Sequence, residues 1–470
     1  MYSDLMGVAE LSLSIGARHF SFSKLTSGGV SGGFSSVSVD SRKIDKGALF
    51  FALEGKTCDG HCYVKEAFDA GACAAVVNGS KLEKFDLVNA AKNAGKDLIV
   101  VENTLKGLQD SARVYLEKFP KLLKIGITGS SGKTTTKEIA ASIISCEKNT
   151  VMNKGNLNSE TGLPISVFEV RDHHEVGIFE LGMNRRNEIS EIAFVLKPNI
   201  ALITNIGTSH IEYFGNKYEI LKEKKCIFKF LKNNDVALIP AKDECAGELA
   251  DGVTGNVKFY GMDSFGELES TSSLGLEGSR IVWAGEKIDF ALPGKHSLQD
   301  AMAAVAIAKE VKVSNNAIKQ GLEAVKPLFG RGEILKGRTT VIRDCYNANP
   351  ESTAGSIEFC DSLDWSGRKI YVIADMLELG EHSFSAHRKL GSILSDSKAD
   401  KIFLFGSEIT AAADYLSGAG KVFSHTNDIN ELSRALDSYV QTTDLVLLKG
   451  SRGRALERLT GMLTGENNVS

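Results

Sequence analysis

The segment GITGSSGKTTTKE, from Gly126 to Glu138, has the composition of a phosphate-binding loop. Consecutive backbone N–H groups in a glycine-rich turn, followed by a helix N-terminus, form a nest for an anion. In this interpretation Gly132 allows the backbone to approach a phosphate, Lys133 contacts the outer phosphates and Thr134 offers its hydroxyl to Mg²⁺. The general pattern requires a glycine where this chain has Ile127. A tight strand–helix turn with an exposed lysine is therefore the alternative interpretation.

Two further side chains follow apolar runs downstream of the loop. Glu180 ends the run VGIFE, and His210 follows ALITNIGTS. The carboxyl ends of parallel strands meet at one edge of a sheet, so both residues are expected near the loop as magnesium ligands. The alternatives are a carboxylate that faces solvent and a structural histidine. A GTPase is disfavoured because NKGN at 153 and NKYE at 216 lack the aspartate that reads guanine.

Strands and helices that alternate along the chain must position these residues. Runs such as VGIFELGM, ALITNIG and DVALIP, separated by helix-like segments, predict a largely parallel sheet with helices on both faces. Residues 36–78 predict a smaller α/β unit, and period-two runs between 257 and 293 predict antiparallel hairpins at the edge of the central domain. After residue 330 the alternation resumes, as in a doubly wound α/β domain.

Length and composition restrict the class of protein. A chain of 470 residues exceeds one hydrophobic core, so two to four domains are expected on size alone. Together with the alternation of strands and helices, this predicts an α/β protein, and we expect domains at 1–118, 119–328 and 329–470. The net charge of −4 argues against a nucleic-acid partner. The N-terminus lacks a signal-peptide pattern and no apolar run could span a bilayer, so we expect a cytoplasmic location without membrane insertion. The eight scattered cysteines are expected to be free thiols, Cys58 and Cys62 of CDGHC included.

Several longer motifs together carry a family resemblance over nearly the whole chain. They are VDSRKIDKGALFFALEGKTCDGH, TGSSGKTTTKE, GNLNSETGLP, FELGMNRRNEI, ITNIGTSHIEYFG, GKHSLQDAMAA, GRGEI, DCYNANPES, ADMLELGEHS and LLKGSRG. The chain thereby resembles the Mur ligases of peptidoglycan synthesis and cell wall biogenesis, in which a TGxxGKT loop replaces the ordinary spacing. The motifs YNANP and DMLELG are similar to motifs of the branch of this family that adds D-alanyl-D-alanine.

The resemblance implies a three-domain ATP-dependent amide ligase, with a UDP-substrate-binding domain, a central phosphate-loop ATPase domain and a C-terminal Rossmann-like domain. It implies that ATP phosphorylates the terminal carboxylate of UDP-N-acetylmuramoyl-tripeptide, and that the amine of D-alanyl-D-alanine attacks the acyl phosphate. ATP and two Mg²⁺ ions are the implied cofactors, and we expect a monomer. The alternatives are a Mur-type ligase that adds a single amino acid or adds glutamate to folate, and a nucleotide-dependent switch protein without ligase chemistry.

The resemblance also implies roles for individual residues. Lys133, His210 and Lys224 are the implied catalytic residues, and Lys224 would be carbamylated so that it binds a metal. Metal ligands are Thr134 and Glu180 for the first Mg²⁺, and His210 and Lys224 for the second. The implied ATP-binding residues are Gly129, Ser130, Ser131, Gly132, Lys133, Thr134, Thr135, Arg331 and Asp344. The implied substrate-binding residues are Ser41, Arg42, Asn158, Asn347 and Asn349.

Alternatives and departures accompany these roles. Lys224 lies in the charge run KEKK, where the alternative is a solvated lysine, and Arg42 could be a surface arginine in a turn. Asp300 stands where the family has Asn, and a carboxylate cannot donate the hydrogen bonds of an amide. Arg343, Ser159 and Ala374 also depart from the family's usual Asp or Glu, Asn and Gly. Because the implied ATP ligands come from two domains, we expect the site to be complete only when the domains close.

Overall fold

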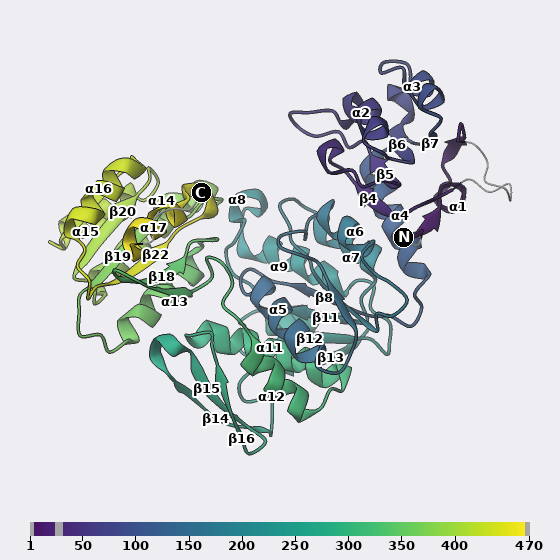
Figure 1. The fold of residues 1–470 in the computed structure, drawn as a ribbon. Coiled ribbons are helices and arrows are strands. Elements are labelled where there is room, and N and C mark those ends of the chain that lie inside the picture. The colour runs from purple at the N-terminus through teal and green to yellow at the C-terminus, as the bar shows by residue number, and fades with distance from the viewer. Residues whose placement is uncertain (1–3, 24–31, 466–470) are drawn as a thin grey trace. The chain divides into compact units, whose positions relative to one another are not determined.

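The computed structural model describes residues 4–23 and 32–465 and contains two compact units (Figure 1). The first unit comprises Met1–Gly126, Asn149–Met183 and Asn187–Asn199. The second comprises Ile127–Lys148, Asn184–Arg186 and Ile200–Ser470. In the described part of the chain, no helix has both the length and the apolar character needed to cross a membrane.

The N-terminal part of the first unit is built on a five-stranded sheet. Its strands lie in the order β2 (Arg18–Phe20), β7 (Asp97–Val101), β6 (Ala74–Asn78), β5 (Ala48–Phe51) and β4 (Ser36–Ser38). All neighbouring strands are parallel except β2 and β7. The apolar runs ALFF and AAVVN are buried against α2 (Val64–Asp69) and α3 (Leu87–Ala94). The small α/β unit predicted over residues 36–78 is confirmed.

Shorter elements complete the first unit. β1 (Met6–Gly7) and β3 (Gly33–Phe34) form an antiparallel pair. The helices of this unit also include α1 (Val8–Ser14), α4 (Thr104–Glu117), α6 (Gly162–Val167) and α7 (Glu188–Leu196). The Asn103 side chain accepts a hydrogen bond from the Lys106 N–H and so caps α4, which packs on α6 and α7.

The central sheet has the strand order β13, β12, β11, β8, β10, β9. These strands are β8 (Leu123–Thr128), β9 (Thr150–Met152), β10 (Val176–Glu180), β11 (Ile200–Ile203), β12 (Val236–Pro240) and β13 (Asn256–Tyr260). The pairs β9–β10, β11–β12 and β12–β13 are parallel. The predicted strands VGIFE, ALI and VALIP are therefore confirmed, and VGIFE ends at the predicted metal ligand Glu180.

The prediction of antiparallel hairpins from residue 257 onward is wrong at its start. β13 is the parallel edge strand of the central sheet, and because of that edge position only Tyr260 of its five residues is buried. The antiparallel set begins later and forms its own sheet of β14 (Leu268–Ser273), β15 (Ser279–Trp283) and β16 (Glu286–Phe290). Period-two patterns do not distinguish an exposed edge strand from a hairpin strand.

Helices of the second unit pack tightly against the helix that follows the glycine loop. α5 (Lys133–Ile144) contacts α11 (Lys295–Val311) and α12 (Asn315–Ala324). A Cβ at Gly321 of α12 would lie 2.2 Å from the Ile143 Cα, so only glycine allows this approach. The second unit also contains the helices α8 (Ile211–Phe214), α9 (Lys217–Lys225) and α10 (Ala246–Ala250).

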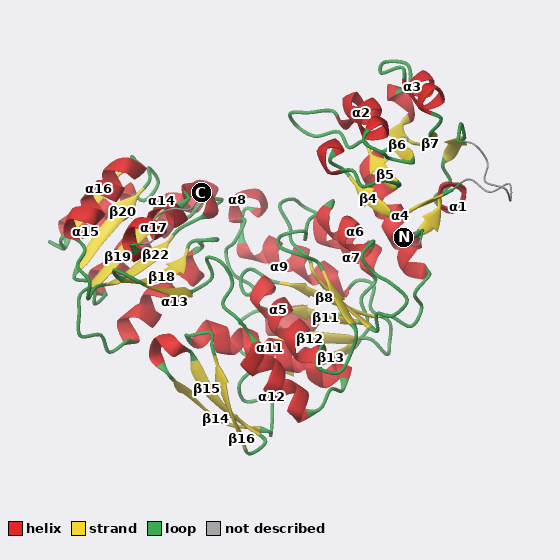
Figure 2. Ribbon diagram, in the orientation of Figure 1, coloured by secondary structure: helices red, strands yellow, loops and turns green. Residues whose placement is uncertain are grey.

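The C-terminal sheet contains six strands, in the order β17 (Glu333–Lys336), β18 (Thr340–Asp344), β22 (Leu445–Lys449), β19 (Lys369–Ala374), β20 (Lys401–Phe405) and β21 (Phe423–Thr426). Only β17 is antiparallel to its neighbour. The helices of this part are α13 (Pro350–Ser362), α14 (Ser383–Asp396), α15 (Thr410–Gly418), α16 (Ile429–Tyr439) and α17 (Thr460–Thr464), which alternate with the strands (Figure 2).

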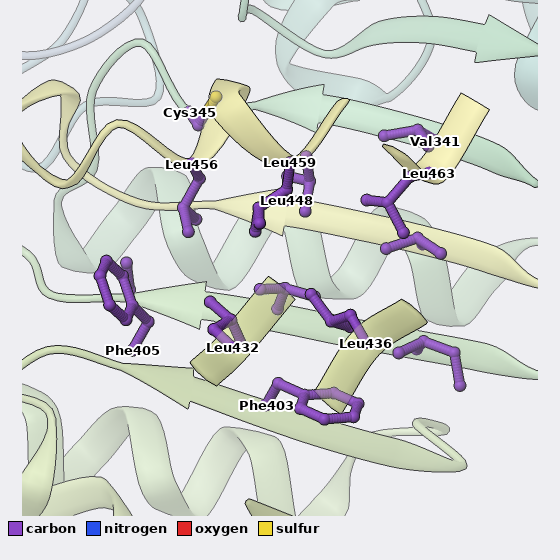
Figure 3. Close-up of a cluster of buried hydrophobic side chains, with 14 of the residues drawn as sticks. Val341, Cys345, Phe403, Phe405, Leu432, Leu436, Leu448, Leu456, Leu459 and Leu463 are labelled. Atoms are coloured by element: carbon purple, nitrogen blue, oxygen red, sulfur yellow. The ribbon is translucent and has the colours of Figure 1, made fainter. Parts of the chain in front are cut away.

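A buried apolar cluster holds this C-terminal part together. Side chains of the sheet, including Phe403 and Leu448, meet Leu432 and Leu436 of α16 and Leu463 of α17 (Figure 3). The predicted doubly wound α/β domain after residue 330 is confirmed. The α/β fold class with three largely parallel sheets is confirmed as well, while the domain boundaries near 118 and 328 stay predictions.

Candidate active site

The glycine loop lies between β8 and α5, where two glycines are required by their surroundings. Gly129 has a φ of 152° and Gly132 a φ of 76°. A Cβ at Gly129 would lie 1.8 Å from the Thr204 Oγ1, and one at Gly132 would lie 2.1 Å from the Asp300 Oδ1. Both backbone conformation and space therefore exclude a side chain, as a close-fitting anion loop requires.

The residues after β11 support the loop from the side. The Ser130 N–H donates to the Asn205 carbonyl oxygen at 3.0 Å, and the Ser131 N–H donates to the Asn205 Oδ1 at 3.0 Å. The Thr204 hydroxyl donates to the Ser131 carbonyl oxygen at 2.6 Å. Binding of phosphate by these two N–H groups would therefore mean replacing Asn205 as their acceptor. Sequence reasoning missed Asn205, although its position directly after a buried strand was a usable signal.

Two lysines meet on one carbonyl oxygen of the loop. The Lys133 Nζ donates to the Gly129 oxygen at 2.9 Å, and the Lys224 Nζ donates to the same oxygen at 2.8 Å. Lys224 comes from α9 and is only 1% exposed. The alternative of a solvated lysine is therefore wrong for Lys224. Burial of an ammonium group is unfavourable unless it is hydrogen-bonded, so this contact contributes directly to the placement of the side chain.

His210 lies beside a residue from the C-terminal part of the chain. Its Nδ1 is 2.7 Å from the Glu378 Oε2, at ion-pair distance but without the angle of a directed hydrogen bond. Both residues have a positive φ, 63° for His210 and 65° for Glu378. The contact with His210 holds the pKa of Glu378 below its usual range, against the opposing effect of burial. Glu378 belongs to DMLELG, which sequence reasoning used for the resemblance without giving this residue a role.

Glu180 is fixed within the first unit by two asparagines. It is 2% exposed at the end of β10, so the alternative of a carboxylate that faces solvent is wrong. Its Oε1 accepts from the Asn158 Nδ2 at 2.7 Å, and its backbone N–H and carbonyl oxygen both bond to the Asn153 side chain. Asn158, predicted to bind substrate, is thus a direct partner of the predicted metal ligand Glu180.

Asp344 is oriented by a buried lysine that sequence reasoning did not single out. The Lys449 Nζ, 2% exposed, donates to the Asp344 Oδ2 at 2.9 Å and to the Asn347 carbonyl oxygen at 3.0 Å. The Ser356 hydroxyl donates to the same carboxylate oxygen at 2.5 Å. Lys449 ends the strand LVLLK, which adjoins β18 in the sheet, so its motif LLKGS contained the signal.

Asn347 and Asn349 differ in their surroundings. Asn347 is exposed, and its side chain accepts from the Ala348 N–H at 2.9 Å. Asn349 is buried and caps α13, since its Oδ1 accepts from the Ser352 N–H at 2.7 Å. Its Nδ2 donates to the Ser209 hydroxyl at 2.5 Å. The structure therefore gives Asn349 a clear local role, while substrate contact by either residue stays a prediction.

The positive charge of Arg331 acts on Asp300, the residue that stands where the family has Asn. Arg331 lies over the Tyr346 ring, with its guanidinium carbon 4.0 Å from the ring centroid. Burial raises the pKa of Asp300 well above its usual range, and the positive charge of Arg331 opposes that shift only in part. A carboxyl group that keeps its proton can donate a hydrogen bond, which a carboxylate cannot.

The departure at Arg343 is compensated within its hairpin. The Arg343 Nε and Nη2 donate to the Glu333 Oε2 at 3.0 and 2.7 Å. Glu333 is directly opposite Arg343 in the β17–β18 register. Opposite charges at facing positions of two strands stabilise the pair. Arg343, which stands where the family has an acidic residue, therefore has a local partner in Glu333.

Ser41 and Arg42 lie in a short 3₁₀ turn, Ser41–Lys43, of the N-terminal part. The Arg42 side chain is 85% exposed and forms a two-pronged contact with Asp40, at 2.9 Å for each pair of atoms. The hydrogen bonds from Arg42 lower the pKa of Asp40 to about 2. The surface turn of the alternative interpretation is observed, and a role of both residues toward UDP stays a prediction.

An acidic cavity of about 560 Å³ adjoins the His210–Glu378 contact. Its lining includes five carboxylates, those of Glu212, Glu378, Glu381, Glu408 and Asp414. Ser383, Ser407 and Thr410 add hydroxyl groups to the same wall. A concave surface with this charge favours a cationic group over an anionic one.

The predicted metal ligands do not form a protein-only cage. Among residues 4–23 and 32–465 there is no group of three or more His, Cys, Asp or Glu side chains arranged to hold a metal. The predicted set of Thr134, Glu180, His210 and Lys224 contains only two side chains of those types. Magnesium binds proteins through few carboxylates together with substrate phosphates and water, and the hard oxygens of Thr134 and Glu180 suit that mode.

Comparison with protein families gives matches over most of the chain. Residues 34–115 match the model described as Mur ligase family, catalytic domain. Residues 127–308 match the Mur ligase middle domain, and residues 330–452 match the Mur ligase, glutamate ligase domain.

Individual relatives match over almost their full lengths. A UDP-N-acetylmuramoyl-tripeptide–D-alanyl-D-alanine ligase of Treponema pallidum is 40% identical, over 92% of this chain and 95% of the relative. The ligase of the same name from Bacillus subtilis is 33% identical, over 90% and 92%.

Solved structures agree with these relatives. A crystal structure of MurF from Acinetobacter baumannii has a TM-score of 0.82 and 29% identity, covering 92% of this chain and 94% of that one. The MurF ligase of Thermotoga maritima in complex with ADP has a TM-score of 0.76 and 26% identity, covering 92% and 97%.

Proposed function

Because the chain belongs to the Mur ligase family, we propose that it joins D-alanyl-D-alanine to UDP-N-acetylmuramoyl-tripeptide, with conversion of ATP to ADP and phosphate. The observation that carries this proposal is the match to a ligase of that name over 92% of the chain, at 40% identity. The product is the pentapeptide precursor of peptidoglycan.

The reaction has two steps. A carboxylate oxygen of the tripeptide attacks the γ-phosphorus of ATP, and ADP leaves. The amine nitrogen of D-alanyl-D-alanine then attacks the acyl carbon of the mixed anhydride, phosphate leaves and the amine loses a proton. Phosphoryl transfer of this kind depends on positioning and on neutralisation of crowded negative charge. Lys133 on the glycine loop and Arg331 beside Asp300 supply positive charge on the nucleotide side.

Residues of the C-terminal part complete the nucleotide site in this proposal. Asp344 accepts hydrogen bonds from ribose hydroxyls, and Lys449 holds its carboxylate in place for that contact. Ser130 and Ser131 lie between the two constrained glycines, and Thr135 lies in the first turn of α5. In this proposal all three contribute groups around the phosphates. The close approach of Thr204 to Gly129 and of Asp300 to Gly132 leaves no room for side chains there. This supports a tightly folded loop whose backbone N–H groups can face a phosphate.

Magnesium, when bound, neutralises the phosphates and the developing charge of the transferred group. Thr134 and Glu180 would hold one ion, with Asn158 orienting the Glu180 carboxylate. His210 and a carbamylated Lys224 would hold the second, and Glu378 would orient the imidazole of His210. Carbamylation replaces the ammonium of Lys224 by an anionic oxygen ligand, which removes a buried positive charge from the loop.

The acidic cavity supports the assignment of the amine-bearing substrate. The amino end of D-alanyl-D-alanine is positively charged in neutral water, and the five carboxylates attract it toward His210. Asn347 lies in the same C-terminal part, where it would contact the dipeptide. Ser41 and Arg42 would contact the UDP end of the other substrate, with Arg42 exchanging Asp40 for an anionic group of the ligand.

The remaining parts of the proposal concern organisation. We infer domain boundaries near residues 118 and 328, a cytoplasmic location, a monomeric enzyme, and no nucleic-acid partner. The family models begin and end within those boundaries, at 34–115, 127–308 and 330–452. The net charge of −4 supports the absence of a nucleic-acid partner.

A substrate-resolved assay tests the proposed function. The purified chain would receive ATP, Mg²⁺ and UDP-N-acetylmuramoyl-tripeptide, with either D-alanyl-D-alanine or single amino acids, and phosphate release and product mass would be measured. We expect phosphate release and pentapeptide formation when the added amine is D-alanyl-D-alanine, and neither when it is a single amino acid. Phosphate release only with single amino acids would overturn the proposed substrate in favour of another Mur-type ligase. Nucleotide binding without any product would favour a switch protein.

A further inference from the structure

The segment Gly207–His210, here called the 207–210 loop, contacts the glycine loop on one side. The Gly207 N–H donates to the Ser130 hydroxyl oxygen at 2.8 Å, and the Ser209 hydroxyl donates to the Ser130 carbonyl oxygen at 3.0 Å. Ser130 is thus held through both its side chain and its backbone. The position of Ser130 in the phosphate site therefore depends on where the 207–210 loop lies.

On its other side the 207–210 loop is held by the first turn of α13. The Glu351 Oε1 accepts from the Thr208 N–H at 3.1 Å and from the Thr208 hydroxyl at 3.0 Å, and its Oε2 accepts from the same hydroxyl at 3.1 Å. Close by, the Asn349 side chain donates to the Ser209 hydroxyl at 2.5 Å. A Cβ at Gly207 would lie 3.1 Å from the Glu351 Cδ, so the missing side chain leaves room for the carboxylate.

A simpler role for Glu351 is stabilisation of its own helix. An acidic residue in the first turn of a helix interacts favourably with the helix dipole, whatever else it touches. Here, however, both carboxylate oxygens bond to a residue 143 positions away in the chain. A second acidic residue of the same helix, Glu358, pairs instead with Lys295 of α11 and does not touch the 207–210 loop.

We propose that Glu351 is a positioning residue, which keeps the 207–210 loop against Ser130 and so sets the glycine loop for nucleotide binding. The chain of contacts runs from Glu351 through Thr208 and its neighbour Ser209 to Ser130. Through these contacts, the geometry of the phosphate site depends on the position of α13. This dependence is separate from the groups that α13 and β18 themselves bring to the nucleotide. The inference rests on the proposed function only in assuming that the glycine loop binds a nucleotide.

The test compares five variants in two measurements. ADP affinity with Mg²⁺ would be measured by calorimetry for Glu351→Ala, Glu351→Gln, Thr208→Ala, the double variant of Glu351→Ala with Thr208→Ala, and the matched control Glu358→Ala. Hydrogen exchange of the backbone over residues 204–210 would be measured without nucleotide. Glu351→Gln keeps an oxygen that accepts from Thr208 but removes the charge, so it separates the contact from the helix-dipole effect.

We expect Glu351→Ala to weaken ADP binding roughly three- to tenfold, the range for loss of one partly exposed hydrogen-bonded contact, and to speed exchange over 204–210. Glu351→Gln should stay within about twofold of the parent, and Glu358→Ala should change neither measurement. Adding Thr208→Ala to Glu351→Ala should give no further loss, because the two residues act through one contact.

Three results would overturn the inference. The first is unchanged exchange and unchanged ADP affinity in Glu351→Ala. The second is an equal effect in Glu358→Ala, which would show that any contact between α13 and the central helices suffices. The third is an equal loss in Glu351→Gln, which would assign the effect to the helix dipole. If the parent chain does not bind ADP, the proposed function fails, whereas the exchange measurement still decides the role of Glu351.

Discussion

The Lys224 Nζ donates to the carbonyl oxygen of Gly129 at 2.8 Å, although the two residues are 95 positions apart in the chain. This contact joins the buried face of α9 to the glycine loop. It places the one lysine that the family resemblance marks for carbamylation on the same carbonyl as Lys133. Lys133 and Lys224 thus reach a common point of the glycine loop.

Replacement of Lys224 by alanine should abolish most ligase turnover. The variant loses the buried group on the loop and the proposed second metal ligand, so we expect a decrease on the order of a hundredfold or more. Lys225→Ala is the matched control, because Lys225 bonds to the Glu248 carbonyl oxygen instead of the loop. Product formation would be measured for both variants at saturating ATP.

The carbamate itself has a separate measurement. With ¹³C-labelled bicarbonate, the parent chain should show a carbamate carbon signal that is absent from Lys224→Ala and present in Lys225→Ala. Full turnover of the parent in buffer freed of carbon dioxide, together with no carbamate signal, would contradict the modification.

The Gly129→Ala variant should lose ADP binding. A methyl group there would overlap the Thr204 Oγ1, 1.8 Å from the Cβ position, and the backbone would keep a φ of 152° that alanine disfavours. Strain and overlap together cost about 2–4 kcal/mol of local stability. The control is Gly252→Ala, which has a φ of 65° but no atom within 4 Å of the added carbon. ADP affinity equal in the two variants would contradict the constrained loop.

The Asp300→Asn variant should be more stable than the parent at neutral pH. The unfolded chain ionises Asp300 near its ordinary pKa of 3.8, whereas burial keeps the folded group protonated to higher pH. Ionisation therefore favours the unfolded chain more and more as pH rises above that value, and asparagine removes this effect. The difference in unfolding midpoint should be small near pH 4 and should grow toward about pH 8.

Asp263→Asn is the control for this pH dependence, because the Asp263 side chain is 76% exposed. A difference for Asp300→Asn that does not grow beyond that of Asp263→Asn between about pH 4 and about pH 8 would contradict a proton held at Asp300 in the folded chain.

Local sequence patterns were sufficient for the elements that carry the site. The site's first elements are encoded by neighbouring residues. The run IGIT forms the end of β8, the glycines form the loop, and the helical segment that begins at Lys133 forms α5. Glu180 ends β10 and His210 follows β11, and the apolar runs VGIF and IALI were sufficient to predict both strands. The error at β13 arose because polar and apolar residues alternate in its sequence NVKF, as they do in a hairpin strand.

The contacts that complete the site were beyond these patterns. Asn205 and Ser131 are 74 positions apart, and Glu351 and Thr208 are 143 apart, so only the path of the chain brings them together. The same holds for Lys449 and Asp344, which meet because β22 and β18 are neighbours in the sheet. Compensation at Arg343 likewise required the register of β17 against β18. A single sequence fixes none of these pairings, because apolar strands pair in many orders.

The transfer of an oxygen atom tests the central claim most directly. The tripeptide substrate would carry ¹⁸O in both oxygens of its terminal carboxylate, and the mass of the phosphate released with ATP, Mg²⁺ and D-alanyl-D-alanine would be measured. Phosphorylation of the carboxylate predicts one ¹⁸O atom in each phosphate, since the amine displaces phosphate together with a carboxylate oxygen. Unlabelled phosphate formed alongside the pentapeptide would contradict the acyl-phosphate route and with it the proposed chemistry of this site.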